Sequence, residues 1–137
     1  MKHWIILFTP ETFEAVKRLH TIGVRGNVWK SFSEKMGKGD RFIGYISKKM
    51  LFDSFGVIDS EPIYEEKAVF PGDKLFPCRR KVKFEKINLN KPSGNLFSGI
   101  APFNEVPTGP GNYLMVKGGF VEISEKDFNW LLKEISR

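Results

Sequence analysis

The feature that most constrains the fold is an apolar run that ends directly at a helix start. Residues 3–8 read HWIILF, and their aromatic and β-branched content predicts a strand. Thr9-Pro10-Glu11 then supplies a hydroxyl for the N-cap, a proline for the first helical position and an acid for the first turn. An apolar stripe at spacings of three and four follows, made of Phe13, Val16 and Leu19 or His20. A strand that leads straight into an amphipathic helix predicts α and β elements packed together.

The end of the sequence predicts a second amphipathic helix. Ser124 is placed to cap it, and Asp127 stands at the third helical position, as in a capping box with Asp in place of Glu. Apolar residues then recur at i, i+3, i+4 and i+7: Phe128, Leu131, Leu132 and Ile135.

Between these helices the pattern is mostly extended. Strands or short extended pieces are expected at residues 41–47, 52–59, 75–87, 113–116 and 119–123. The first two of them are placed to form a hairpin. The segment from Gly23 to Asp40 is rich in Gly, Asn, Ser and Lys, which predicts a loop with one short helical turn over 32–36. The whole pattern predicts one α+β domain over residues 1–137, built on a curled, mainly antiparallel sheet.

Charge, apolar runs and cysteine content limit the classes of partner and the cellular compartment that we expect. The net charge of +6 and the pI of about 9.5 favour an anionic partner. The longest apolar run, residues 4–8, is far too short to cross a bilayer and starts too early for a signal peptide, so we expect neither. Cys78 is the only cysteine, which excludes an intramolecular disulfide; we expect a buried, inert thiol in a cytoplasmic protein.

Positive charge is concentrated in two segments. Residues 25–49 carry seven cationic side chains and two acidic ones, a balance of +5, and residues 79–86 carry five and one, a balance of +4. The second segment alternates as a strand, with Arg80 on the same face as Val82 and Phe84. A guanidinium on an apolar face must be paired or must reach a ligand, so Arg80 either pairs with an acid such as Asp53 or Asp59 or borders a pocket.

Aromatic residues lie among these cations, as in proteins that bind single-stranded nucleic acid. Trp29 and Phe70 stand beside Gly or Pro and are the least typical of a core, so each is a candidate for ligand contact. Residues for catalysis or metal binding are scarce: the chain has two histidines, His3 and His20, and no Cys/His cluster. GKGD at 37–40 and GPGN at 109–112 lack the spacing of phosphate-binding loops and are expected to be tight turns.

Several motifs in order resemble those of the EVE domain, a member of the PUA-like superfamily related to YTH and ASCH domains. The matching stretches are GVR at 23–25, MGKGD at 36–40, YIS at 45–47, FGVIDSEP at 55–62, KLFPCRRKVKF at 74–84 and GGFVEISEKDF at 118–128. HWIILFTPETFEAVK at 3–17 is similar to the archaeal branch of that family. The resemblance implies a PUA-like, curled antiparallel or mixed β-barrel flanked by helices.

The same resemblance implies a pocket on the side of the barrel for one base, which is often modified. Carried over by position, its residues are Thr9, Gly23, Val24, Arg25, Tyr45 and Ser47. This chain departs from the pattern at Thr21, where many relatives have Trp, and at Gly26, where many have Asn. Asn27 and Trp29 stand nearby as replacements, and Phe70 is added as a loop aromatic.

These observations lead to the hypothesis of a non-catalytic, monomeric reader of nucleic acid, RNA in preference to DNA, with no cofactor, metal or membrane partner. Its phosphate contacts are expected from six cationic residues: Lys30, Lys48, Lys49, Arg79, Arg80 and Lys81. Two alternatives remain open. One is an enzyme acting on a nucleotide or RNA through carboxylates and lysine, and the other is a basic protein-interaction module.

Overall fold

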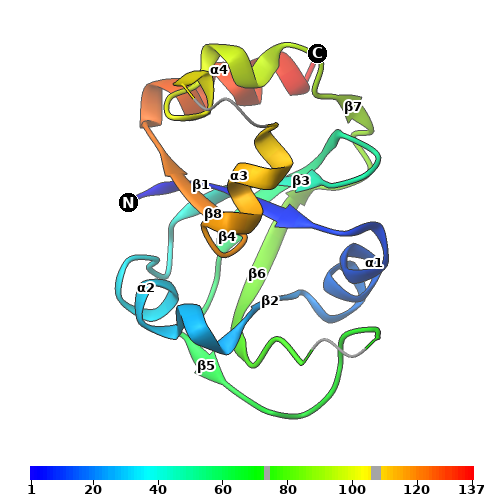
Figure 1. The fold of residues 1–137 in the computed structure, drawn as a ribbon, viewed down its shortest axis with the longest axis vertical. Helices are drawn as coiled ribbons and strands as arrows, with labels where there is room; N and C mark the ends of the chain where they lie inside the picture. The colour runs from blue at the N-terminus through cyan, green and yellow to red at the C-terminus, as the bar shows by residue number, and fades with distance from the viewer. Residues whose placement is uncertain (73–74, 106–108) are drawn as a thin grey trace.

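The computed structural model describes residues 1–72, 75–105 and 109–137 (Figure 1). The order of its elements is β1 (His3–Phe8), α1 (Pro10–Leu19), β2 (Thr21–Val24), the 3₁₀ turn η1 (Gly26–Val28), α2 (Trp29–Glu34), β3 (Arg41–Ile46), β4 (Leu51–Ile58), β5 (Ile63–Tyr64), β6 (Cys78–Lys86), β7 (Lys91–Pro92), the 3₁₀ turns η2 (Leu96–Gly99) and η3 (Phe103–Glu105), α3 (Pro110–Val116), β8 (Phe120–Ile123) and α4 (Glu125–Ile135).

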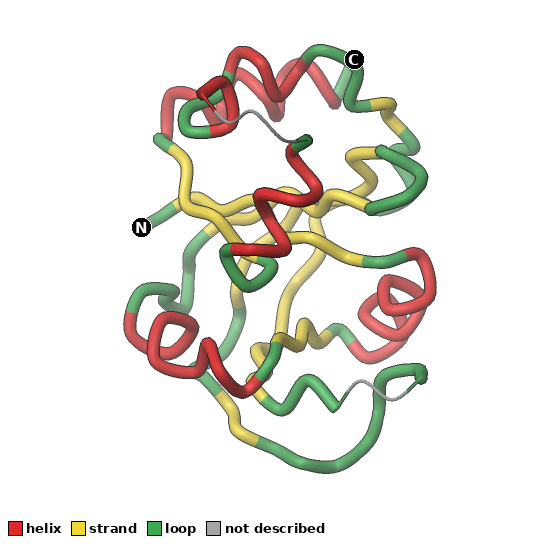
Figure 2. Tube along the Cα trace, in the orientation of Figure 1, coloured by secondary structure: helices red, strands yellow, loops and turns green. Residues whose placement is uncertain are grey.

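The strands form one curled sheet in the order β2-β6-β4-β3-β1-β8, with β5 added beside β6 and β7 beside β4. β1 and β3 run parallel, whereas the other pairs are antiparallel, so the sheet is mixed. Register shifts at Gly44/Tyr45 and Phe55/Gly56 are bulges of the kind that bend strands. The result is a half-barrel flanked by four helices, which confirms the predicted fold class (Figure 2).

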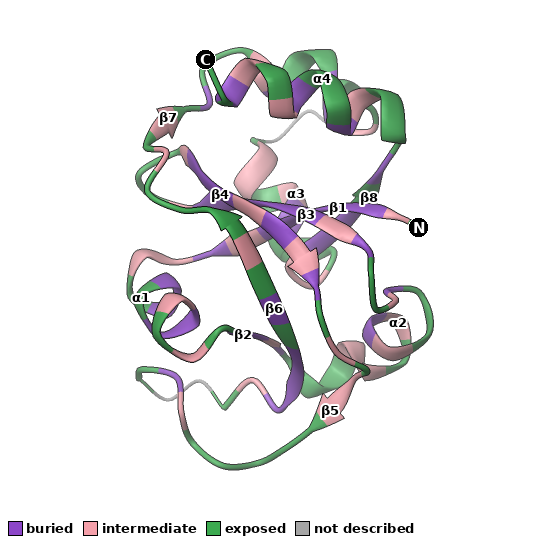
Figure 3. Ribbon diagram, turned by 180° about the vertical axis from the view of Figure 1, so that it is seen from behind, coloured by how far each residue is buried: buried purple, intermediate pink, exposed green. Residues whose placement is uncertain are grey.

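Both faces of β1 are buried, which explains its continuous apolar sequence. Trp4, Ile6 and Phe8 join a core that also includes residues of α1 and α2, whereas Ile5 joins a second core that includes residues of α4. β6 is buried only in part, and its exposed residues are drawn green in Figure 3. The helices therefore cover opposite faces of the central strands and leave the outer face of β6 open.

Both predicted helix caps are confirmed. The Oγ1 atom of Thr9 accepts a hydrogen bond from the Thr12 amide at 3.1 Å, with Pro10 at the first helical position. The Oγ atom of Ser124 accepts one from the Asp127 amide, also at 3.1 Å. The tight turn at 37–40 is confirmed as well, because the Asp40 amide donates to the Gly37 carbonyl and Gly39 has a φ of 95°.

The structure differs from the expectations for the loop over 23–40, for residues 113–116 and for GPGN at 109–112. Residues 21–24 form β2 because they pair with β6, and residues 29–34 form α2, which starts earlier than the expected turn. Residues 113–116 belong to α3, and GPGN at 109–112 starts that helix, with Pro110 at its first position. Tertiary pairing and packing override weak local preferences at these places.

The Asp40 side chain links the first residues of the chain to the turn before β3 through hydrogen bonds. Its carboxylate, in a residue only 5% exposed, accepts hydrogen bonds from the Lys2 amide (3.0 Å), the Trp4 indole (3.0 Å) and the Gly37 amide (2.7 Å). Burial alone raises the pKa of this carboxyl, but the three bonds and the charged N-terminus outweigh burial. The pKa therefore lies below its ordinary value of 3.8.

A lowered pKa in the folded state means that Asp40 stabilises the fold when it is charged. Its contribution is complete above about pH 4 and is lost as the pH falls further, through the folded-state pKa. We therefore expect Asp40→Asn to be less stable at neutral pH and to lose less stability on acidification than the wild type. Urea unfolding at several pH values measures both effects. Parallel pH profiles for the two proteins would show that Asp40 carries no such linkage.

Candidate functional site

A pocket opens where the carboxyl ends of β1 and β2 meet the turn between α3 and β8. Its cavity volume is about 90 Å³, which is small beside the roughly 300–1,000 Å³ of typical small-molecule sites. The lining residues are Leu7, Phe8, Thr9, Thr12, Gly23, Val24, Arg25, Phe76, Met115, Gly118 and Gly119. A space of this size suits one flat group that enters from an open mouth.

Backbone pairing holds each part of the pocket in place. Val24, at the end of β2, pairs with Cys78 of β6, and the Leu7 amide donates to the Gly119 carbonyl at 2.8 Å. Gly118 and Gly119 have φ values of 93° and 99°, in the left-handed region that favours glycine. These two glycines let the chain turn sharply from α3 into β8 beside the end of β1.

Gly23 permits two aromatic residues to close over β2. A Cβ atom at this position would lie 2.5 Å from a ring carbon of Phe70 and 2.9 Å from the Cβ of Phe76. Both distances are shorter than real contacts allow, so any side chain at position 23 would displace these residues. Phe76 lines the pocket, whereas Phe70 is buried beside it, with its ring centroid 5.7 Å from that of Phe76.

The polar groups of the pocket are two hydroxyls and one guanidinium. Thr9 Oγ1 donates to Thr12 Oγ1 at 2.9 Å, and Thr12 is only 6% exposed. In such a pair, one hydroxyl donates its proton to the oxygen of the other, and the second hydroxyl keeps its own O–H to donate elsewhere. Arg25 is exposed at the mouth, so the pocket offers one neutral donor and one cation.

Four of the nine base-pocket residues expected from the sequence line this pocket: Thr9, Gly23, Val24 and Arg25. The other five lie outside its lining. Asn27 is exposed on η1, and Ser47 is half-buried, with its amide donating to the Phe8 carbonyl at 2.8 Å. Tyr45 is buried in the core that includes α4, with its ring 5.0 Å from that of Phe97.

The two loop aromatics singled out from the sequence serve packing. Trp29 is half-buried and stands edge-on to Tyr64, with 5.4 Å between ring centroids. Phe70 is 5% exposed and packs under Arg79. The aromatic residues that line the pocket are Phe8 and Phe76, and the place of Phe76 as the first residue of the FP-x-R motif was the available signal. Thr12 was also missed, although it stands one helical turn after the Thr9 cap and therefore on the same side.

The six expected phosphate contacts divide into two groups. Lys30, Lys48, Lys49 and Lys81 are exposed. Arg79 and Arg80 are buried, at 2% and 0% exposure, and their guanidinium groups donate to backbone carbonyls, so both are removed from the expected phosphate-binding set. The expected pairing of Arg80 with Asp53 or Asp59 is also wrong, since no ion pair of Arg80 occurs in the described part of the chain.

Cys78 is fully buried, as expected from its place in the strand. Burial raises the pKa of its thiol, which disfavours the reactive thiolate. Its sulfur donates to the Arg25 carbonyl at 3.3 Å and so helps to hold the end of β2. In the described ranges, no group of three or more His, Cys, Asp or Glu residues is gathered to hold a metal ion, and no helix is both long and apolar enough to span a bilayer.

Comparison with solved structures identifies the fold. The YTH domain-containing protein mmi1, in a complex with RNA, has a TM-score of 0.69 at 16% identity, covering 98% of this chain and 80% of that one. The YTH domain of Zygosaccharomyces rouxii MRB1, in a complex with N6-methyladenosine RNA, has a TM-score of 0.66 at 12% identity, covering 97% and 86%. A protein from Pseudomonas syringae has a TM-score of 0.63 at 18% identity, covering 97% and 99%.

No protein-family model matches this sequence, and no curated protein matches it. The structural likeness nevertheless extends over nearly the whole chain. It establishes a PUA-like fold of the YTH type, in agreement with the architecture expected from the sequence motifs.

Proposed function

We propose that this protein is a non-catalytic reader of RNA that holds one base, modified or unmodified, in the pocket between β1, β2 and the α3–β8 turn. The observation that carries the proposal is the agreement of two results. The fold is like that of domains solved with RNA, and the pocket contains Thr9, Gly23, Val24 and Arg25, positions at which the resemblance to the EVE domain implies a base site.

The chemistry of the lining supports a flat, partly apolar ligand. Leu7, Val24, Phe76 and Met115 supply apolar contact, and an aromatic wall favours stacking with a heterocycle. The Thr9–Thr12 hydroxyl pair offers a donor to an acceptor on the edge of the base. A pocket with apolar walls and few polar groups also accommodates an added methyl group, which is the reason to include modified bases.

Exposed cations near the mouth suit the phosphates of the same strand. Arg25 is in the lining, and Lys48 and Lys49 directly follow Ser47, whose amide is bonded to the Phe8 carbonyl beside the pocket. Lys30 and Lys81 are exposed farther along the chain and complete the proposed phosphate contacts. Contacts of this kind position the strand without reading its sequence and make binding depend on salt.

We further propose that the chain is an EVE-type domain that acts as a single unit over residues 1–137. A monomer in the cytoplasm fits the lone, buried Cys78 and the absence of any need for a second copy to complete the pocket.

Titration of labelled single-stranded and duplex RNA and DNA tests the proposal. Single-stranded RNA is expected to bind most tightly, and the logarithm of its association constant is expected to fall linearly with the logarithm of salt concentration between about 50 and about 200 mM. Absence of binding at low salt would refute the proposal. Conversion or cleavage of the nucleic acid, detected by mass spectrometry, would favour an enzyme instead.

Thr12 offers the sharpest single change in the pocket. Thr12→Val keeps the shape of the side chain and the amide that caps onto Thr9, but it removes the hydroxyl that is proposed to contact the base. We expect RNA affinity to fall by about three- to tenfold, the loss of one neutral hydrogen bond. Thr12→Ser retains the hydroxyl and serves as the matched control, with a loss of less than about twofold. Equal affinities for all three proteins in the same titration would exclude the contact.

A further inference from the structure

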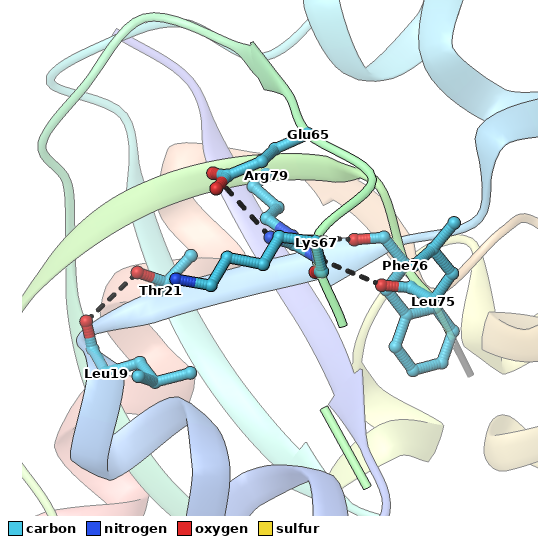
Figure 4. Close-up of polar contacts among 7 residues, drawn as sticks. All are labelled: Leu19, Thr21, Glu65, Lys67, Leu75, Phe76 and Arg79. Carbon is cyan, nitrogen blue, oxygen red and sulfur yellow. Dashed lines mark hydrogen bonds and ion pairs between the residues drawn. The ribbon is translucent and has the colours of Figure 1, made fainter. Parts of the chain in front are cut away.

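Arg79 is a buried cation whose guanidinium contacts residues of the two segments 65–70 and 75–76. The Arg79 guanidinium donates from Nε to the Phe76 carbonyl at 3.1 Å and from Nη2 to the Leu75 carbonyl at 3.1 Å. Nη2 also donates to the Lys67 carbonyl, and Nη1 lies 3.6 Å from the Glu65 carboxylate. Figure 4 shows these partners gathered around the one side chain.

The contacts join these two arms of the chain. Glu65 and Lys67 lie on the arm that leaves β5, and Leu75 and Phe76 lie on the arm that returns to β6. Between the arms, the ring of Phe70 lies under the guanidinium, 5.4 Å from its central carbon. The Glu65 amide also donates to the Pro77 carbonyl at 2.8 Å, so both arms are bonded to each other as well as to Arg79.

Phe76 has a backbone conformation that its surroundings must stabilise. Its φ is 45°, in the left-handed region that a bulky residue adopts only when its surroundings hold it there. Its carbonyl is bonded to Arg79, its Cβ lies over Gly23, and it lines the pocket. We call the Arg79 guanidinium and the partners it contacts the Arg79 clamp. Arg79 is itself opposite Gly23 in the β2–β6 ladder, so the Arg79 clamp and the pocket wall are held by the same pair of strands.

We propose that Arg79 is a positioning residue for the ligand: it holds Phe76 in its left-handed conformation as the aromatic wall on which the bound heterocycle stacks. The inference rests on the proposed function and adds Arg79 to it. The charge of Arg79 serves the protein's own carbonyls rather than a phosphate, because its donors are already used inside the fold. Charge-assisted bonds to several carbonyls suit a fork of N–H groups and cannot be reproduced by a lysine ammonium.

A double-mutant cycle tests the inference with fluorescein-labelled, random-sequence single-stranded RNA. Arg79→Lys and Phe76→Leu are each expected to weaken binding by about tenfold, the loss of one stacking contact. If Arg79 acts through Phe76, Arg79→Lys causes no further loss in the Phe76→Leu protein. Arg18→Lys is the matched control, because it makes the same chemical change at an exposed residue of α1, and it is expected to change affinity by less than about twofold.

Amide hydrogen exchange of Arg79→Lys without RNA separates this inference from the proposed function. Faster exchange confined to the amides of Glu65 and its neighbours, with α4 unchanged, supports the Arg79 clamp. Additive losses in the cycle, or unchanged exchange in residues 65–77, overturn the role of Arg79 even if the wild type binds RNA well. A wild-type protein that binds no RNA overturns the proposed function, whatever the exchange result.

Discussion

Replacement of Arg80 by methionine is expected to lower the free energy of unfolding by about 3 kcal/mol. The Arg80 side chain is 0% exposed and donates to the carbonyls of Ser60 (3.0 Å), Phe32 (2.8 Å) and Met36. Phe32 belongs to the last turn of α2, where a cation also interacts favourably with the helix dipole. Methionine fills a similar volume but leaves these carbonyls without a donor.

The expected loss of unfolding free energy depends on the carbonyls that Arg80→Met leaves without a donor. A buried acceptor without a partner costs about 1–3 kcal/mol, and at least two of these carbonyls are in buried surroundings. Part of that cost is offset because methionine avoids the desolvation of a charge; burial lowers the pKa of Arg80 for the same reason, against the opposing influence of Glu61 and Asp40. The estimate is therefore well below the sum over all the bonds.

Urea unfolding measures this prediction, with Lys83→Met as its control. Lys83 lies on the same strand and is exposed, so its replacement is expected to change stability by less than about 0.5 kcal/mol. Equal stabilities for the two variants would mean that the carbonyls around Arg80 find other donors.

Reversal of charge at the pocket mouth is expected to weaken RNA binding by about tenfold at low salt. Arg25 is exposed, so Arg25→Glu leaves the core untouched, and stability is expected to change by less than about 0.5 kcal/mol. The change removes one cation and adds one anion beside the proposed phosphate path. The salt dependence of binding is expected to become shallower as well, because fewer counterions are released.

Lys126→Glu is the control that separates a local effect from a general one. It produces the same change in net charge, from +6 to +4, but Lys126 lies on α4, at the far end of the molecule from β2 (Figure 1). Its RNA affinity is expected to fall by less than about twofold. Similar losses for both variants would indicate attraction by overall charge, with no part played by the pocket.

Local sequence signals predicted the parts of the fold that depend on near neighbours. Thr9 and Ser124 predict the helix starts because a cap is formed between residues only three apart in the sequence. The continuous apolar run HWIILF predicts a strand, and that strand is buried on both faces. β2 was not predicted, and α2 was predicted only as a short turn over 32–36. β2 is ordered by pairing with β6, and α2 by the bonds that its carbonyls accept from Arg80, which are contacts with residues far along the chain.

The pocket was predicted in part for the same reason. The motif GVR and the capping Thr9 were visible in the sequence, and both line the cavity. Phe76 and Met115 come from segments that are distant in the sequence, and only the folded chain brings them to the end of β2. Arg79 and Arg80 looked like phosphate ligands because charge alone does not distinguish an exposed guanidinium from one bonded to internal carbonyls.

Methyl-group NMR during titration with short single-stranded RNA tests the central claim most directly. The claim is that a base enters the cavity at the ends of β1 and β2, so the methyl signals of Leu7, Thr12, Val24 and Met115 are expected to shift together as RNA is added. Those of Leu131 and Ile135 on α4 are expected to stay in place. Saturable binding that leaves the pocket methyls unmoved and shifts signals elsewhere would contradict the account.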